Sequence, residues 1–177
     1  MISEQLLKEI LEQYPLTWDG VHGVSHWARV LENGRKLAPL TGANITVVEL
    51  FAVLHDAKRN NEGFDFVHAP AGAKYAAELR GSVFQLDETD FSLLYQACRD
   101  HTKGFTHADI TVQTCWDADR LDLSRVGIIP KPKRLCTDAA KDPGVIAWAL
   151  ERATARAIPA LVKVEWGIEL NRGSPTP

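Results

Sequence analysis

The sequence has few cysteines and no long apolar run, and each of these features argues against certain classes of protein. Its three cysteines, Cys98, Cys115 and Cys136, are widely spaced and form no CxxC pair. We therefore expect neither a disulfide framework nor a zinc knuckle, and a reducing cytoplasm is the typical setting of such a chain. No apolar run reaches about 18 residues, and no charged-then-apolar segment opens the chain. The sequence thus predicts neither a membrane span nor a signal peptide.

Positive charge is not in excess either. The chain has 20 Lys and Arg residues against 23 Asp and Glu, a formal net charge of −3, and no stripe of interleaved basic and aromatic residues. This balance disfavours nucleic acid as the main ligand and an anionic membrane as a partner. The hydrophobic content of 45% and the length of 177 residues are ordinary for one domain with a real core.

Alternating β patterns are missing as well, whereas helical periodicity recurs along the chain. The segment "DITVQTCW" is the one candidate strand, and Asp109 fits better as the N-cap of a helix. A capping box of Thr46 and Glu49 is expected to start another helix, and Asp142 a third. The expected helices cover residues 3–14, 25–38, 47–58, 68–80, 87–101, 109–123, 142–156 and 159–170.

The chain shows no internal repeat and no domain linker. We therefore predict a single-domain, all-α helical bundle over residues 1–172, followed by a disordered tail over residues 173–177.

Several histidines and acids occupy positions where an amphipathic helix places leucine. His26, His55, His101 and Asp119 each fall on the apolar stripe of their expected helix, and Asp56 lies at the flank of the stripe beside His55. A single inward histidine is usually a hydrogen-bonded core residue. Several such residues on four helices together indicate a bound ion, because helix-bundle cores often hold metals on imidazole and carboxylate ligands.

The segment "WDADRLDL" offers three aspartates, and the helical wheel separates them. Asp117 projects with polar residues, Asp122 sits at the edge of the inward stripe, and Asp119 lies within it. A buried carboxylate needs a cation or strong donors, so we choose Asp119 as the ligand. The alternative is an ion pair with Arg120 or Arg125.

The order His26, then His55-Asp56, then Asp119 resembles the HD-domain superfamily of metal-dependent phosphohydrolases. The segments "LHDAKR" and "DADRLDL" carry most of this resemblance, which spans most of the chain. It implies an all-α core of the HD-domain type, in which His26, His55, Asp56 and Asp119 bind a first divalent ion. The ion would be Mn, Mg, Zn, Co, Ni or Fe, with one or two per chain.

Superfamily members with two metals have two further histidines between the His-Asp pair and the last aspartate, and His68 and His101 occupy that interval. The resemblance leaves two roles open for each of them: a second-metal ligand, or a catalytic group that binds the substrate phosphate or acts as general acid. His22 and His107 are expected to be loop residues.

The basic residues near these ligands suit a phosphate. Arg59 is expected to reach the cavity of His55 and to act in binding and catalysis, and Lys58, Lys103 and Arg120 are further substrate-binding candidates. Lys58 has the alternative role of a helix-end cation that suits the helix dipole. Glu62, in the loop "NNEGFD", is a candidate for proton transfer.

The leading functional hypothesis is a metal-dependent phosphohydrolase that acts on a small phosphorylated or nucleotide-like molecule through a metal-activated water. Two alternatives share the ligand set: an HD-fold diiron oxygenase, and a non-catalytic HD protein that binds a metal or nucleotide. We expect a small-molecule partner and no membrane, and the pattern says nothing of oligomeric state.

Overall fold

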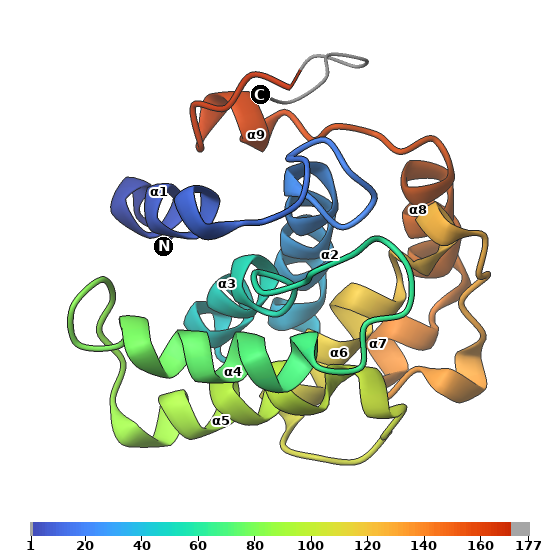
Figure 1. Ribbon diagram of the computed structural model, residues 1–177. Coiled ribbons are helices and arrows are strands. Elements are labelled where there is room, and N and C mark those ends of the chain that lie inside the picture. The colour runs from blue at the N-terminus through green and yellow to red at the C-terminus, as the bar shows by residue number, and fades with distance from the viewer. Residues whose placement is uncertain (1, 171–177) are drawn as a thin grey trace.

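The chain forms a bundle of helices, and its computed structural model describes residues 2–170 (Figure 1). The α-helices in this range are α1 (Glu4–Gln13), α2 (Val24–Thr41), α3 (Ile45–Leu54), α4 (His68–Leu79), α5 (Glu88–Asp100), α6 (Ile110–Arg120), α7 (Asp138–Lys141), α8 (Pro143–Thr154) and α9 (Leu161–Val164). Three short 3-10 helices, η1 (His101–Lys103), η2 (Leu123–Val126) and η3 (Pro132–Arg134), complete the described secondary structure, apart from one isolated bridge between Arg80 and Phe84. The predicted all-α single domain is confirmed.

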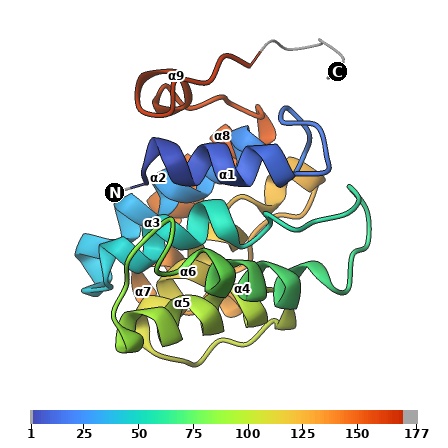
Figure 2. The same ribbon diagram turned by 60° about the vertical axis from the view of Figure 1, so that its left-hand side comes forward.

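The helices are arranged in layers. Helices α2, α3 and α6 form the middle, α4 and α5 lie side by side on one face, and α1 and α9 lie on the opposite face (Figures 1 and 2). Helix α3 is the most apolar, and eight of its ten residues are buried. A helix that is apolar all round belongs at the centre of a fold. The large side chains of Trp27, Phe51 and Trp116 are buried in this core: Trp27 packs against Tyr14 on the side of α1, and Trp116 donates from Nε1 to Ala97 O of α5.

The start of α3 differs from the prediction. Its N-cap is Asn44, whose side-chain oxygen accepts hydrogen bonds from the backbone N–H groups of Thr46 and Val47. The Thr46–Glu49 capping box is therefore wrong, and Glu49 instead accepts a hydrogen bond from Arg35 Nε at 2.8 Å. The helix also ends early, at Leu54 rather than residue 58, so that His55 and Asp56 lie in a turn.

Other predicted boundaries also shift. Helix α2 continues past residue 38 through Pro39 and ends at Gly42, whose φ of 76° gives the left-handed cap that glycine adopts without strain. Helix α6 stops at Arg120 rather than 123, and a turn leads into η2. The expected connection before Asp142 contains η3 and α7, and the last expected helix is reduced to α9. The predicted tail over 173–177 lies outside the described residues.

The C-terminal part covers the end of the bundle. Leu37 of α2 and Leu121 pack with Leu135 and with Ala140, Val145 and Ala149 of α7 and α8. This small second core lies over the face of α6 that the helical wheel predicts to be polar and solvent-exposed. Polar residues on that face, Asp117 among them, are consequently buried.

Helix α4 approaches the end of α3 so closely that only glycine fits at residue 72. A Cβ atom there would lie 2.8 Å from the carbonyl oxygens of both Leu54 and His55. We expect Gly72→Ala to lower the free energy of unfolding by about 1–3 kcal/mol, since the backbone of α3 must move. Urea denaturation measures this, with the exposed Lys74→Ala as the control on the same helix. An alanine variant as stable as the wild type would contradict the close approach.

Candidate metal centre

Four predicted ligands meet at the centre of the bundle. His26 lies in the first turn of α2, His55 and Asp56 lie in the turn that ends α3, and Asp119 lies in the last turn of α6. All four are buried, and the two histidines have no exposed surface. The packing of α2, α3 and α6 in the middle layer brings together residues that are up to 93 positions apart in the chain, from His26 to Asp119.

Their ligating atoms face one another at short range. His26 Nε2 lies 3.1 Å from His55 Nε2, 3.6 Å from Asp56 Oδ2 and 3.6 Å from Asp119 Oδ1. His55 Nε2 lies 3.7 Å from Asp56 Oδ2 and 3.8 Å from Asp119 Oδ1. Ligands bound at about 2.0–2.2 Å to one ion lie roughly 3–3.5 Å apart, so the spacing of this first group suits a single metal ion.

A second group lies beside the first and shares Asp56. His68, at the start of α4, places Nε2 3.2 Å from Asp56 Oδ1, and His101, just after α5, places Nε2 3.6 Å from the same oxygen. The two imidazole Nε2 atoms are 3.2 Å apart. Asp56 therefore turns one carboxylate oxygen to each group. No hydrogen bond satisfies the buried Oδ1 among the described residues, as expected of an oxygen that binds a cation.

The hydrogen bonds behind the histidines fix their tautomers. The Nδ1 atoms of His26, His55, His68 and His101 lie 2.7, 3.1, 2.6 and 2.7 Å from Asp122 Oδ2, Phe51 O, Asp65 O and Cys98 O, respectively. Since an oxygen without a proton can only accept, each Nδ1 must donate. A neutral imidazole then presents an unprotonated Nε2. With a cation present, four such Nε2 atoms and two carboxylates can all serve as ligands, and the groups behind the imidazoles hold them in that orientation.

No protein-family model and no curated protein sequence matches this chain. One solved structure matches it: a predicted HD superfamily hydrolase from an uncultured Thermotogales bacterium, with a TM-score of 0.63 and 26% sequence identity. The match covers 84% of this chain and 85% of that one. This chain has the HD-domain fold.

His55 and Asp56, the HD pair of this HD-domain chain, are buried, and their surroundings shift the pKa of both side chains. Burial lowers the pKa of His55 to about 3, against an ordinary value of 6.5, so the imidazole is neutral near pH 7. Burial alone would raise the pKa of Asp56, but the surrounding imidazoles, His55 foremost, hold it well below its ordinary value. The pair therefore offers a neutral nitrogen and an ionised carboxylate, the forms that bind a metal.

The shifted pKa of His55 makes the stability of the metal-free HD domain depend on pH. Between about pH 6.5 and pH 3 the unfolded chain binds a proton at His55 that the folded chain does not. The contribution of neutral His55 to the free energy of unfolding is fully present above pH 6.5. Below pH 6.5 the free energy of unfolding falls by about 1.4 kcal/mol per pH unit. Urea denaturation with a chelator present should show this loss, and His55→Gln should reduce the slope. Equal slopes for the two proteins would contradict the assignment.

The HD-domain centre opens into a cavity of about 560 Å³. Asp56, His68, His101 and Asp119 all line it, so a ligand in this cavity reaches both groups. Most of the remaining wall comes from the segment between α6 and η3 and from the residues that follow His101.

The structure brings only part of the predicted basic set to this cavity. Arg59 lines it, is buried, and places Nη1 3.2 Å from His68 Nε2 and 3.8 Å from Asp56 Oδ1. Arg120 also lines it, but its Nη atoms donate to the carbonyl oxygens of Arg134 and Phe105.

Lys58 and Lys103 do not line the cavity. Lys58 points to the opposite side of its turn, where it donates to Gln13 Oε1 and lies over the Tyr75 ring. Lys103 pairs with Asp100 at 2.9 Å. Both lysines thus have partners away from the centre, and their role in substrate binding stays a prediction.

The wheel was also wrong about Asp117. Asp117 is fully buried, and its carboxylate accepts hydrogen bonds from the backbone N–H of Cys136 and from the N–H and hydroxyl of Thr137. These hydrogen bonds hold the segment around Cys136 and Thr137 against α6. Asp122 is buried too, and it accepts from His26 and from Arg29 Nε at 2.7 Å. Asp119, as predicted, faces the centre.

One further residue of the cavity, His22, was expected to be only a loop residue. His22 lines the cavity, and its Nδ1 lies 2.6 Å from Glu62 Oε2. Sequence reasoning placed His22 in an ordinary loop, although it lies four residues before His26, and gave Glu62 only a candidate role. The signal that unites them is a contact over 40 residues, which periodicity does not reveal.

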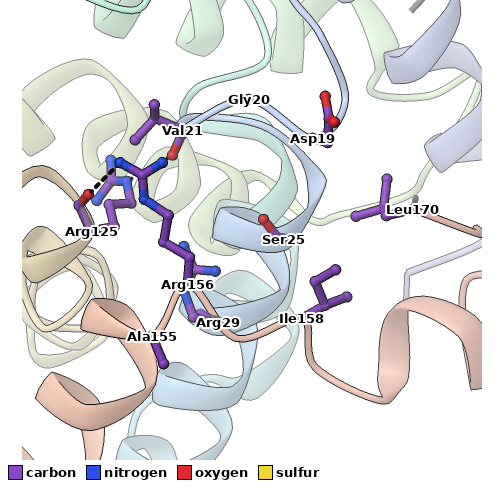
Figure 3. Close-up of a pocket in the computed structure, with 10 residues that line it drawn as sticks. All are labelled: Asp19, Gly20, Val21, Ser25, Arg29, Arg125, Ala155, Arg156, Ile158 and Leu170. Carbon is purple, nitrogen blue, oxygen red and sulfur yellow. Dashed lines mark hydrogen bonds between the residues drawn. The ribbon is translucent and has the colours of Figure 1, made fainter. Parts of the chain in front are cut away.

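A smaller cavity of about 340 Å³ lies on another side of Arg125, which lines both (Figure 3). Arg29 and Arg156 also line it, and Arg156 donates to the carbonyl oxygen of Arg125. None of the candidate metal ligands lines this cavity. Arg29 is already bound to Asp122 and to the carbonyl oxygen of Ala157, so it supports the centre from behind.

Proposed function

We propose that this protein is a metal-dependent phosphohydrolase that acts on a small phosphorylated molecule. The observation that carries the proposal is the set of four imidazole Nε2 atoms and two carboxylates that face one another beside a cavity. The solved structure with the same fold is described as a predicted HD superfamily hydrolase, which supports a hydrolytic reaction. None of the helices in residues 2–170 is long and apolar enough to cross a bilayer.

The ligand set fits two divalent ions. His26, His55, Asp56 and Asp119 would hold the first, and Asp56, His68 and His101 the second. Bound there, the ions would supply an activated water and polarise the phosphoryl oxygens. Because the Nε2 atoms of His68 and His101 point at Asp56 Oδ1, we assign both histidines as ligands in preference to the general-acid role.

The reaction requires proton movement that the protein's own residues can supply. A water oxygen forms a bond to phosphorus, and the bond from phosphorus to the ester oxygen breaks with its electron pair going to that oxygen. The ester oxygen gains one proton and the water loses one, which gives an alcohol and inorganic phosphate. Glu62 orients His22 by accepting from its Nδ1–H, and His22, which lines the cavity, is the general acid for the ester oxygen. Arg59 stabilises the charge on the phosphoryl oxygens.

Hydrolysis of a generic phosphomonoester tests the proposal. The purified protein is stripped with a chelator, reloaded separately with Mn, Mg, Co, Ni, Zn or Fe, and assayed with p-nitrophenyl phosphate. We expect release of nitrophenol with at least one metal and none after chelation. Tight metal or nucleotide binding without hydrolysis in any form would favour the non-catalytic alternative.

The shared Asp56 carboxylate also favours one other function. Two ions joined by a carboxylate suit a diiron oxygenase, and the same ligand groups would hold the irons. Oxygen consumption by the iron-loaded protein, with no phosphoester hydrolysis in any metal form, would support this second candidate.

Replacing His22 tests the proton-transfer role. We expect His22→Gln to lower kcat about 100-fold, in the range of general acid catalysis. Metal content should not change, because His22 belongs to neither ligand group. His107→Gln, an exposed loop histidine outside the cavity, is the matched control. A normal kcat in His22→Gln would remove His22 from the mechanism.

A further inference from the structure

We infer that the substrate has an aliphatic body and a second anionic group, and that it is not a nucleotide. The inference rests on the proposed function, since it places the substrate's phosphoryl group at the metal centre. It concerns the rest of the cavity, which at about 560 Å³ holds far more than one phosphate group.

The wall beyond the centre is aliphatic. Leu123, Val126, Ile128, Ile129 and Pro130 follow one another along the segment that leaves α6, and all line the cavity. Val126, Ile128 and Ile129 are 41%, 54% and 62% exposed, although large apolar side chains are usually buried. An exposed apolar surface that lines a cavity beside a catalytic centre is typical of a ligand-binding wall.

The same wall lacks the groups that recognise a nucleobase. Proteins hold bases by stacking them on aromatic rings and by pairing their edges with amide or acidic side chains. Among the described residues that line the cavity there is no Phe, Tyr, Trp, Asn or Gln, and the two acids, Asp56 and Asp119, belong to the metal centre. A base would therefore lie on aliphatic side chains with its polar edge unpaired.

Two cations beside this wall are free to bind an anion. Lys131 and Arg134 both line the cavity, and neither side chain forms a hydrogen bond or ion pair within residues 2–170. The other arginines of the wall are assigned or engaged: Arg59 to the phosphoryl group, Arg120 to the carbonyl oxygens of Arg134 and Phe105, and Arg125 to Val21 O. Because neither Lys131 nor Arg134 pairs with a carboxylate among the described residues, both suit a carboxylate or a second phosphate of the substrate.

The segment that carries these cations is held in place on α6. Arg120 Nη1 donates to the carbonyl oxygen of Arg134 at 3.0 Å, and the Asp117 carboxylate accepts from the N–H groups of Cys136 and Thr137 at 2.7 and 2.8 Å. Because Asp119 lies between these two anchors on the same helix, the cation pair and the metal centre are fixed relative to each other. Such a fixed pair can select a substrate whose two anionic groups have the matching separation.

A substrate series tests this inference. The metal-loaded protein is assayed with ω-carboxyalkyl phosphates of increasing chain length, with alkyl phosphates of the same lengths, and with adenosine monophosphate. We expect the best carboxyalkyl phosphate to exceed its alkyl counterpart in kcat/KM by about tenfold, and the nucleotide to be the poorest of the three. A nucleotide preferred over both chains would overturn the inference.

Matched variants assign the selectivity to the two cations. The double variant Lys131→Gln/Arg134→Gln should raise KM for the carboxyalkyl phosphate about tenfold and leave the alkyl phosphate unchanged. Lys133→Gln is the control, because Lys133 is exposed in the same 3-10 helix but does not line the cavity. Equal effects of the double variant on both substrates would contradict a second anion site.

A binding measurement separates this inference from the proposed function. Calorimetry with a non-hydrolysable ω-carboxyalkyl phosphonate compares the wild type, the double variant and Lys133→Gln, whether or not phosphate esters are hydrolysed. Weaker binding in the double variant alone supports the second anion site even if hydrolysis fails. Equal binding by all three proteins overturns it even if hydrolysis succeeds.

Discussion

Replacing Asp56 by alanine is expected to empty both metal groups at once and to lower phosphoester hydrolysis by about 10³-fold or more. The reason is geometric: Asp56 is the residue common to the two groups, with Oδ2 near His26 and Oδ1 near His68 and His101. Bound metals stabilise the transition state by several kcal/mol, which corresponds to a rate loss of this size. Elemental analysis and the p-nitrophenyl phosphate assay measure the two effects.

Two single-group variants serve as controls for Asp56→Ala. His26→Ala should weaken the first ion most and His101→Ala the second, because each histidine belongs to one group. Circular dichroism at the assay temperature shows whether each variant is folded. An Asp56→Ala protein that keeps one full equivalent of metal would show that the carboxylate does not join the groups.

The second large effect is expected at Asp122, which belongs to neither ligand group but contacts the ligand His26. Its carboxylate accepts from His26 Nδ1 at 2.7 Å and from Arg29 Nε at 2.7 Å and Nη2 at 3.0 Å. Asp122→Ala removes the group that fixes the tautomer of His26, so we expect a loss of metal affinity of about 10–100-fold. It also leaves the buried Arg29 charge without its partner, which should cost about 3–5 kcal/mol of stability.

Asp122→Asn separates these two effects. The amide keeps the volume of the side chain but lacks the charge, so the variant should fold better than Asp122→Ala and still bind metal more weakly than the wild type. Asp138→Asn, in an exposed ion pair with Lys141, is the control and should change stability by less than about 1 kcal/mol. Wild-type metal affinity in both Asp122 variants would contradict the positioning role.

Much of the first metal group could be predicted from the sequence, because helical periodicity is a local property. His26, His55 and Asp119 lie on apolar stripes, and a residue on such a stripe faces the core wherever the helix packs. The structure confirms that all three are buried at one point.

The helical wheel gave a wrong prediction of burial where a segment distant in the sequence covers a helix face. Asp117 falls on a face that would be solvated if α6 were the outer layer, but residues 134–141 cover it and supply its hydrogen-bond donors. Asp122 lies beyond the end of α6 at Arg120, where helical angles no longer apply.

Contacts between loops that are distant in the sequence could not be predicted from the sequence either. The pairing of His22 with Glu62 joins two loops 40 residues apart, and no periodic pattern places one loop on another. The burial of His68 depends on a loop as well, since the segment before it folds back through hydrogen bonds from Arg59 to Asn61 and Gly63.

The most direct test of the whole account measures metal content and phosphate release on the same preparation. The protein is titrated with one divalent metal, bound metal per chain is determined by elemental analysis, and hydrolysis of p-nitrophenyl phosphate is followed at each point. We expect saturation at two ions per chain, with hydrolysis rising as the sites fill and vanishing on chelation. Hydrolysis that persists at full rate in metal-free protein, or saturation without metal bound at His26, His55 and Asp56, would contradict it.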